Sequence, residues 1–175
     1  HFTLAAIIVL LAGPLLAQNQ IEVSDVAGST FRQRSVSGLN WMNEGRYYSA
    51  LSENKVIKYD VRTGNEVETL VDGSVLNIKI DDFQFSDDES IILLLTDRQS
   101  IYRRSFTAVY YLFTRENSQL TKLSEGRQSY ASLSPDNKKV AFVRDRNLFY
   151  KNLNSGEETA ITTDGTFNKI INGST

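Results

Sequence analysis

Short apolar runs alternate with polar turns along most of the chain, and the same order of run and turn occurs three times. Each run is rich in Val, Ile, Tyr and Phe and is bounded by Asp, Asn, Gly or Ser. Such runs favour β-strands, because β-branched and aromatic side chains suit a pleated sheet and the bounding residues suit tight turns. No long window repeats its apolar residues at the period of a helix. The pattern therefore predicts an all-β protein.

Each repeat opens on a large apolar residue, which a turn and then a longer apolar run follow. The opening residues are Trp41, Phe85 and Leu133, which lie 44 and 48 residues apart. Two further runs complete each repeat, so that every repeat is expected to hold four strands joined by hairpin turns. Four strands in a period of about 40 to 50 residues are typical of the blades of a β-propeller.

The repeats divide the chain into a partial β-propeller of about three four-stranded antiparallel blades. We place the blades at residues 36–73, 80–126 and 128–165, with the start of a fourth at 166–175 and a polar lead at 18–35. A β-sandwich also has evenly spaced strands, but the repeated order of aromatic residue, turn and apolar run favours the propeller. Propellers typically close with four to eight blades, so we expect the parent protein to continue past this chain.

Residues 1–17 have a different character from the repeats. An apolar run from Leu4 to Leu11 precedes a Gly-Pro pair, and the segment ends at the small residue Ala17. This layout is typical of a secretory signal peptide. The run is short for a bilayer span of about 20 residues, and a retained anchor through residues 2–17 is the alternative to cleavage. Either way, we expect an exported protein, periplasmic or extracellular.

Composition excludes several kinds of chemistry. Hydrophobic residues make up 41% and charged residues 23% of the chain, which is typical of globular proteins. A net charge of -2 argues against a nucleic-acid-binding surface. There is no cysteine, and the one histidine, His1, precedes the signal. The mature chain therefore cannot hold a Ser-His-Asp triad, a disulfide or a Cys/His metal site, and we expect no cofactor.

A group of acidic residues could suggest a calcium site. Their spacing does not fit an EF-hand loop, and residues 86–90 fall where each repeat has its first hairpin turn. We therefore interpret the group as part of a solvated turn, with no metal bound. Its members are Asp81, Asp82, Asp87, Asp88 and Glu89.

The second repeat is longer than the others over residues 96–105, and propellers often place functional residues on such extensions. This segment carries Arg103 and Arg104 between Tyr102 and Phe106. An extended backbone would point the two arginines to opposite faces. Solvated edge charges that discourage aggregation are the alternative, and composition alone favours that second interpretation.

Four segments are similar to one known family. Residues 102–110 resemble the arginine-bearing segment of the dipeptidyl peptidase IV propeller, and residues 36–41 and 130–136 resemble the openings of its first and third blades. Residues 170–175 resemble the stretch just before the paired-glutamate motif of the family. Over about residues 20–175, the chain thus resembles the N-terminal propeller of dipeptidyl peptidase IV-like enzymes, in the prolyl oligopeptidase family of serine peptidases.

The resemblance implies an exported or membrane-anchored serine peptidase that removes dipeptides from N-termini with proline or alanine in second position. It implies that the propeller covers a C-terminal α/β-hydrolase domain carrying the catalytic Ser, Asp and His. In the family, two propeller glutamates bind the amino group of the substrate and a propeller arginine hydrogen-bonds a substrate carbonyl. By position Arg103 matches that arginine, and Arg104 beside it is the second candidate.

The same resemblance places the glutamates, the nucleophile and the histidine beyond Thr175. We therefore expect the 175-residue chain to be inactive alone. The expected partners are peptide substrates and the hydrolase domain of the same full-length chain, with a homodimer left open and no nucleic acid. The alternative function is that of a non-catalytic exported β-propeller that acts as a protein-binding scaffold.

Overall fold

The structure is a computed structural model that describes residues 21–28, 30–31 and 37–173. The expected signal peptide at residues 1–17 lies outside the described residues. The chain divides into two compact units, His1–Ser35 and Val36–Thr175. In the first unit, the described part is the short helix α1 (Val23–Ala27) and its flanks. Within the described ranges, no helix has the length and apolar character needed to cross a membrane.

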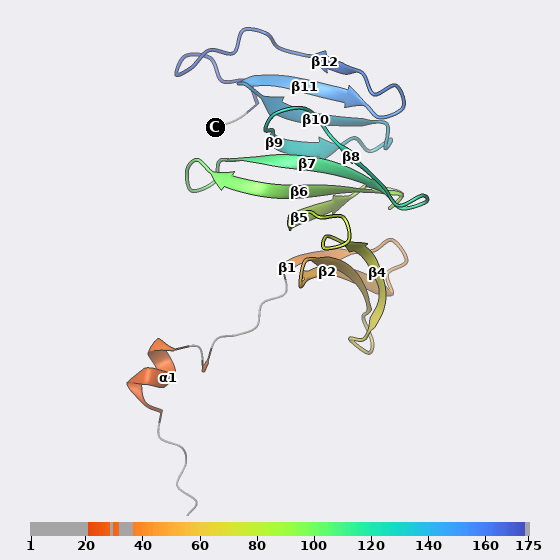
Figure 1. The fold of residues 1–175 in the computed structure, drawn as a ribbon, viewed down its shortest axis with the longest axis vertical. Coiled ribbons are helices and arrows are strands. Elements are labelled where there is room, and N and C mark those ends of the chain that lie inside the picture. The colour runs from red at the N-terminus through yellow and green to blue at the C-terminus, as the bar shows by residue number, and fades with distance from the viewer. Residues whose placement is uncertain (1–20, 29, 32–36, 174–175) are drawn as a thin grey trace, which may run out of the picture. The chain divides into compact units, whose positions relative to one another are not determined.

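The second unit consists of three four-stranded antiparallel sheets, in which every strand pairs with the next one along the chain. Figure 1 shows the three sheets following one another in chain order. The first blade holds β1 (Ser37–Trp41), β2 (Tyr47–Ser52), β3 (Lys55–Asp60) and β4 (Glu66–Asp72). The second holds β5 (Ile80–Phe85), β6 (Ile91–Ser100), β7 (Phe106–Thr114) and β8 (Gln119–Lys122). The third holds β9 (Ser129–Leu133), β10 (Lys139–Arg144), β11 (Asn147–Asn152) and β12 (Glu158–Ala160).

The predicted fold class is confirmed in its main features: the second unit is all-β and has three four-stranded antiparallel blades. Trp41, Phe85 and Leu133 each form the last residue of the first strand of a blade. In the described stretch 161–173, the chain forms one isolated bridge, between Thr166 and Ile170, and no strand. The start of a fourth blade at 166–175 stays a prediction.

The core lies between the blades rather than within any one of them. In β6, Ile92 and Leu94 join a cluster with residues of the first blade, whereas Leu93 and Leu95 join a cluster with residues of the third. Successive side chains of a strand point to opposite faces of the sheet. An uninterrupted apolar run therefore belongs in a sheet that is covered on both faces, and β6 occupies such a sheet.

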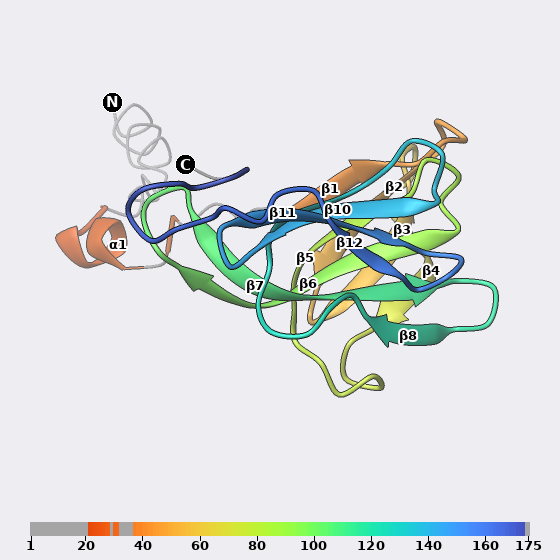
Figure 2. The ribbon, with the colours of Figure 1, turned by 90° about the horizontal axis from the view of Figure 1, so that it is seen from above.

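The first turn of each blade has one shared geometry. Gly45, Glu89 and Asn137 occupy equivalent turn positions and adopt positive φ angles of 64°, 58° and 57°. Glycine adopts this conformation without steric cost, and asparagine adopts it more readily than most residues. Figure 2 looks along the stacked blades, where these hairpins lie at the same end of the second unit. The repeat seen in the sequence is therefore also a repeat of backbone conformation.

These turns also link neighbouring blades by hydrogen bonds. The backbone N–H of Asn43 donates to Oε1 of Glu89 at 2.5 Å, and the N–H of Asp87 donates to Oδ1 of Asn137 at 2.9 Å. The donor and the acceptor occupy the same two repeat positions in both links. The third blade has Pro135 at the donor position, and proline has no N–H to donate. The same link therefore cannot continue from the third blade to a following one.

The β5–β6 turn is stabilised by an ionised carboxylate, as expected for a solvated turn. Oδ1 of Asp88 accepts hydrogen bonds from the Ser90 hydroxyl at 2.7 Å, the Ser90 N–H at 3.0 Å and the Ser86 hydroxyl at 2.7 Å. These hydrogen bonds, those from Ser90 first, lower the pKa of Asp88 to about 2. Asp136 repeats this arrangement in the third blade, where the Ser134 hydroxyl donates to it and its pKa is also lowered.

We expect Phe142→Ala to weaken the junction between the second and third blades. The Phe142 side chain is 1% exposed and stacks on Phe149 with ring centroids 5.8 Å apart. Removing a buried aromatic ring costs about 3–5 kcal/mol, which denaturant unfolding of the intact protein would measure. Phe167→Ala is the control, because Phe167 is 67% exposed and should cost under about 1 kcal/mol. Equal unfolding midpoints for the two variants would contradict the assignment of the core.

We expect Asp88→Asn to flatten the acid limb of the stability profile. The folded-state pKa of Asp88, about 2, lies below its ordinary value of 3.8, so its ionised form stabilises the fold above about pH 4. That contribution is lost as the pH falls from about 4 towards 2. The measurement is the unfolding midpoint as a function of pH, with Asp87→Asn as control because Asp87 bonds through its backbone. Parallel profiles for wild type and Asp88→Asn would show that the turn carboxylate contributes nothing.

Candidate functional site

The arginine pair predicted from the sequence lies on the hairpin formed by β6 and β7. The pairing runs without a break from Ile91↔Thr114 to Thr96↔Val109, shifts register, and resumes at Gln99↔Thr107. Asp97 lies at this shift with a positive φ of 49°. A bulge of this kind bends a hairpin and changes its direction. The extra length expected over residues 96–105 is therefore present: β6 continues to Ser100, and a bend follows over residues 101–104.

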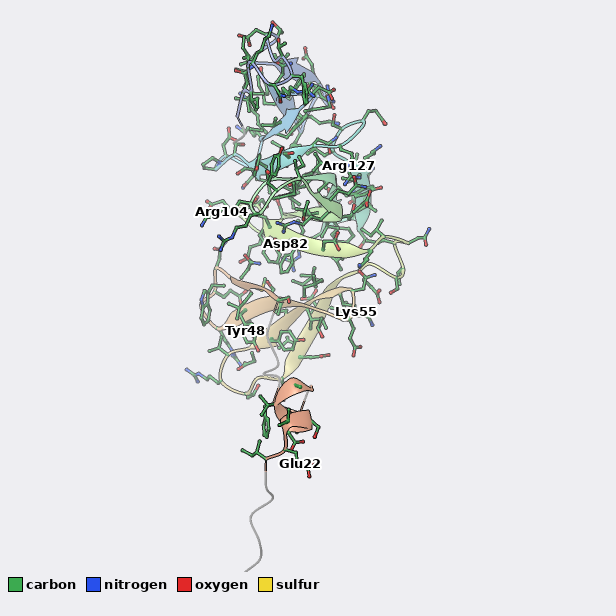
Figure 3. The ribbon with its side chains drawn as sticks, turned by 90° about the vertical axis from the view of Figure 1, so that its left-hand side faces the viewer. Glu22, Tyr48, Lys55, Asp82, Arg104 and Arg127 are labelled. Carbon is green, nitrogen blue, oxygen red and sulfur yellow. The ribbon has the colours of Figure 1, made fainter. Side chains whose placement is uncertain are left out.

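Arg103 and Arg104 lie in the bend at the tip of this hairpin, where both are exposed. The bend is closed by hydrogen bonds from the N–H groups of Ile101, at 2.8 Å, and Tyr102, at 3.2 Å, to the carbonyl oxygen of Ser105. The backbone here is not extended, so the condition under which the two arginines would point to opposite faces of a strand is not met. Figure 3 shows Arg104 extending outward from the hairpin.

A groove of about 330 Å³ adjoins the hairpin tip, and we call it the hairpin groove. Its lining combines four aromatic rings with three guanidinium groups. Arg103 and Arg104 are not among the residues that line it, although their neighbours Tyr102 and Ser105 are. The lining residues are Ile101, Tyr102, Ser105, Phe106, Arg127, Ser129, Tyr130, Val143, Arg144, Asp145, Arg146, Phe167, Asn168 and Ile171.

All three groove cations are engaged by protein groups. Nη1 of Arg144 donates to Oε2 of Glu158 at 2.8 Å, and its guanidinium lies 4.5 Å from the ring centroid of Phe149. The guanidinium of Arg146 lies 5.0 Å from the ring centroid of Phe167. These contacts hold both side chains in the wall of the groove, and the Glu158 carboxylate offsets the charge of Arg144.

Arg127 contacts the base of the hairpin from the segment that leads into the third blade. Its Nε donates to Oγ1 of Thr107 at 3.0 Å, and its Nη2 donates to the Thr107 carbonyl at 3.1 Å. The same guanidinium also donates to the carboxylate and the carbonyl oxygen of Asp97. Arg127 therefore bonds both strands of the hairpin at the level of the register shift.

Tyr110 lies on β7 in the inner part of the hairpin, and it is 4% exposed. Burial raises the pKa of its phenol, so Tyr110 stays neutral at physiological pH and contributes to packing rather than proton transfer.

Sequence reasoning found the hairpin and missed the groove. Three groove arginines lie 20 or more residues along the chain, in the third blade and in the segment that leads into it: Arg127, Arg144 and Arg146. No local motif distinguishes them from ordinary surface cations. The blade repeat alone would have indicated that the segments leading into and following β9 meet the β6–β7 end, because successive blades stack side by side.

Three consecutive four-stranded blades define the chain as part of a β-propeller protein. It belongs to the family described as the dipeptidyl peptidase IV (DPP IV) N-terminal region, whose model matches residues 86–175. The matched region contains the whole arginine-bearing hairpin and the lining of the groove.

Individual relatives agree with this assignment. Human prolyl endopeptidase FAP is 25% identical over 155 residues, which cover 87% of this chain and 20% of that protein. The probable dipeptidyl-aminopeptidase B of Ajellomyces dermatitidis is 42% identical over 84 residues, covering 46% of this chain and 9% of that protein. The crystal structure of Porphyromonas gingivalis dipeptidyl peptidase 4 superimposes with a TM-score of 0.73 at 29% identity, over 85% of this chain and 22% of that one. The chain thus spans about a fifth of the length of the relatives that it matches along most of its own length.

Proposed function

We propose that this chain is the N-terminal propeller segment of an exported serine dipeptidyl aminopeptidase, which releases Xaa-Pro and Xaa-Ala dipeptides from peptide N-termini. The observation that carries the proposal is the arginine-bearing hairpin, which lies inside the region matched by the family model. Homology to dipeptidyl peptidases along most of the chain supports it. The hydrolase domain of the same full-length protein supplies the catalytic Ser, Asp and His.

The segment contributes substrate access and one contact. Arg103 donates hydrogen bonds to a carbonyl of the bound peptide, and Arg104 is the second candidate for this role. Within residues 37–173, no ion pair or side-chain hydrogen bond engages either guanidinium. A guanidinium presents its donors in a rigid planar fork, so an exposed arginine on a fixed hairpin can orient a peptide carbonyl. Its exposure at the tip supports such a contact with a bound molecule.

The protein acts outside the cytoplasm, in the periplasm or the extracellular space. Residues 2–17 direct its export, either as a cleaved signal or as a retained anchor. Its partners are peptides with proline or alanine in second position.

We expect Arg103→Ala to lower kcat/KM of the intact natural protein for a chromogenic Xaa-Pro substrate about 5- to 150-fold. This range corresponds to the roughly 1–3 kcal/mol lost when a polar partner is left without its hydrogen bond. Arg104→Ala is the comparison, because it removes the other exposed arginine of the tip, which is the second candidate for the contact. A larger loss for Arg104→Ala than for Arg103→Ala would exchange the two roles.

Two results would overturn the proposal. An unchanged kcat/KM for both variants would show that neither arginine contacts the substrate. An intact protein that takes no active-site serine label and cleaves no Xaa-Pro substrate would instead be a non-catalytic scaffold.

A further inference from the structure

The outer part of the β6–β7 hairpin has less apolar support than the rest of the blade. The β6 residues from Ile92 to Thr96 are buried, whereas residues 97–100 are all exposed. Burial of apolar surface is the main stabilising term for a sheet. On β6 this burial ends at the register shift, whereas Phe106 of β7 still packs against the core. Polar contacts therefore determine the direction of the hairpin beyond Thr96 together with the packing of the Phe106 ring.

A neighbouring segment, residues 127–130, provides most of these contacts. The N–H of Gln128 donates to the carbonyl of Ala108, and the carbonyl of Gln128 accepts from the N–H of Ala108, both at 2.8 Å. The Ser129 hydroxyl donates to the carbonyl of Phe106 at 2.6 Å, and the Phe106 ring meets the Tyr130 ring edge-on at 5.5 Å. All of these contacts reach β7, the second strand of the hairpin.

The segment is itself fixed in place. The Gln128 side chain is fully buried, and its Nε2 donates to the carbonyl oxygens of Ser124, Glu125 and Gly126 at 3.0–3.3 Å. Arg127, beside it, therefore projects from a rigid backbone. Such an anchored side chain can hold the hairpin rather than move with it.

Within segment 127–130, Arg127 is the residue whose side chain bonds both strands of the hairpin. It donates to Thr107 on β7 through Nε and Nη2, and to Asp97 on β6 through both terminal nitrogens. Its side chain is 28% exposed. The contact lies at the register shift, which is where the buried part of the hairpin ends and bending is easiest.

A small change of angle at this point moves the tip by a large amount. Beyond Asp97, β6 continues for three residues to Ser100, which span about 10 Å at roughly 3.3 Å per strand residue, and Arg103 lies in the bend that follows. A rotation of about 5° at the shift therefore displaces the tip by about 1 Å. A misplacement of that size is enough to cost an enzyme up to about 100-fold in rate.

We propose that Arg127 is a positioning residue, which sets the angle of the hairpin and thereby places Arg103 for its contact with the substrate. The proposal rests on the function proposed for Arg103. Arg127 itself acts through the hairpin and makes no contact with substrate. A merely structural arginine would stabilise the junction between the blades without any specific coupling to Arg103.

A double-mutant cycle in the intact protein tests this coupling. We expect Arg127→Ala to lower kcat/KM for a Xaa-Pro substrate about tenfold in the wild-type background, and to change it less than about twofold in the Arg103→Ala background. Arg127→Lys should recover only part of the loss, because an ammonium cannot reproduce the planar fork that reaches both strands. Arg115→Ala is the control, since Arg115 bonds the Glu89 carbonyl at the opposite end of the same hairpin.

Hydrogen exchange at the hairpin tip gives a readout that does not depend on activity. The Ile101 N–H is bonded to the Ser105 carbonyl. Its exchange rate should rise at least about tenfold over the wild-type rate in Arg127→Ala and should equal the wild-type rate in Arg115→Ala. Losses of kcat/KM that add in the double variant, or exchange at Ile101 that does not change, would overturn the positioning role. If Arg103→Ala leaves kcat/KM unchanged, the function proposed for Arg103 is wrong, and the exchange rate alone then decides whether Arg127 holds the hairpin.

Discussion

The burial of β6 on both faces is the constraint on which the rest of the second unit depends. A single four-stranded blade is too thin to cover its own apolar surface, so its stability comes from the blades beside it. Ile92 and Leu94 require the first blade, and Leu93 and Leu95 require the third. The arginine-bearing hairpin is a direct extension of this strand, and its base is therefore as fixed as the stack itself.

Polar links at the two ends of the junction between the second and third blades set the angle between these blades, which apolar contact alone does not set. Hydrophobic attraction is non-directional, so it brings two sheets together without setting the angle between them. The bond from Asp87 to Asn137 connects the turns at one end, and the bonds of Arg127 connect the hairpin base at the other. Two directional contacts so far apart define the orientation of one blade on the next.

The sequence predicted the features that depend on local pattern. The spacing of Trp41, Phe85 and Leu133 predicted the three blades, because strand alternation and turn chemistry are encoded within a few residues. The resemblance singled out Arg103, whereas the bend that exposes it follows from the Ile101–Ser105 closure. Arg127 could not be predicted, because its partners lie 20 and 30 residues away on another blade and its own surroundings in the sequence carry no motif.

The support of the hairpin tip comes from residues distant in the sequence for a physical reason. A residue that contacts a bound molecule has to be exposed, and exposure at the hairpin tip removes the apolar packing that fixes side chains elsewhere. Its position must then come from hydrogen bonds, which are directional but individually worth only about 1 kcal/mol. Several bonds to one anchored guanidinium meet this requirement, since Arg127 engages both strands from the backbone that Gln128 holds. In the proposed arrangement, the tip is both exposed and well placed because the segment leading into the neighbouring blade adds its hydrogen bonds to the pairing within the hairpin.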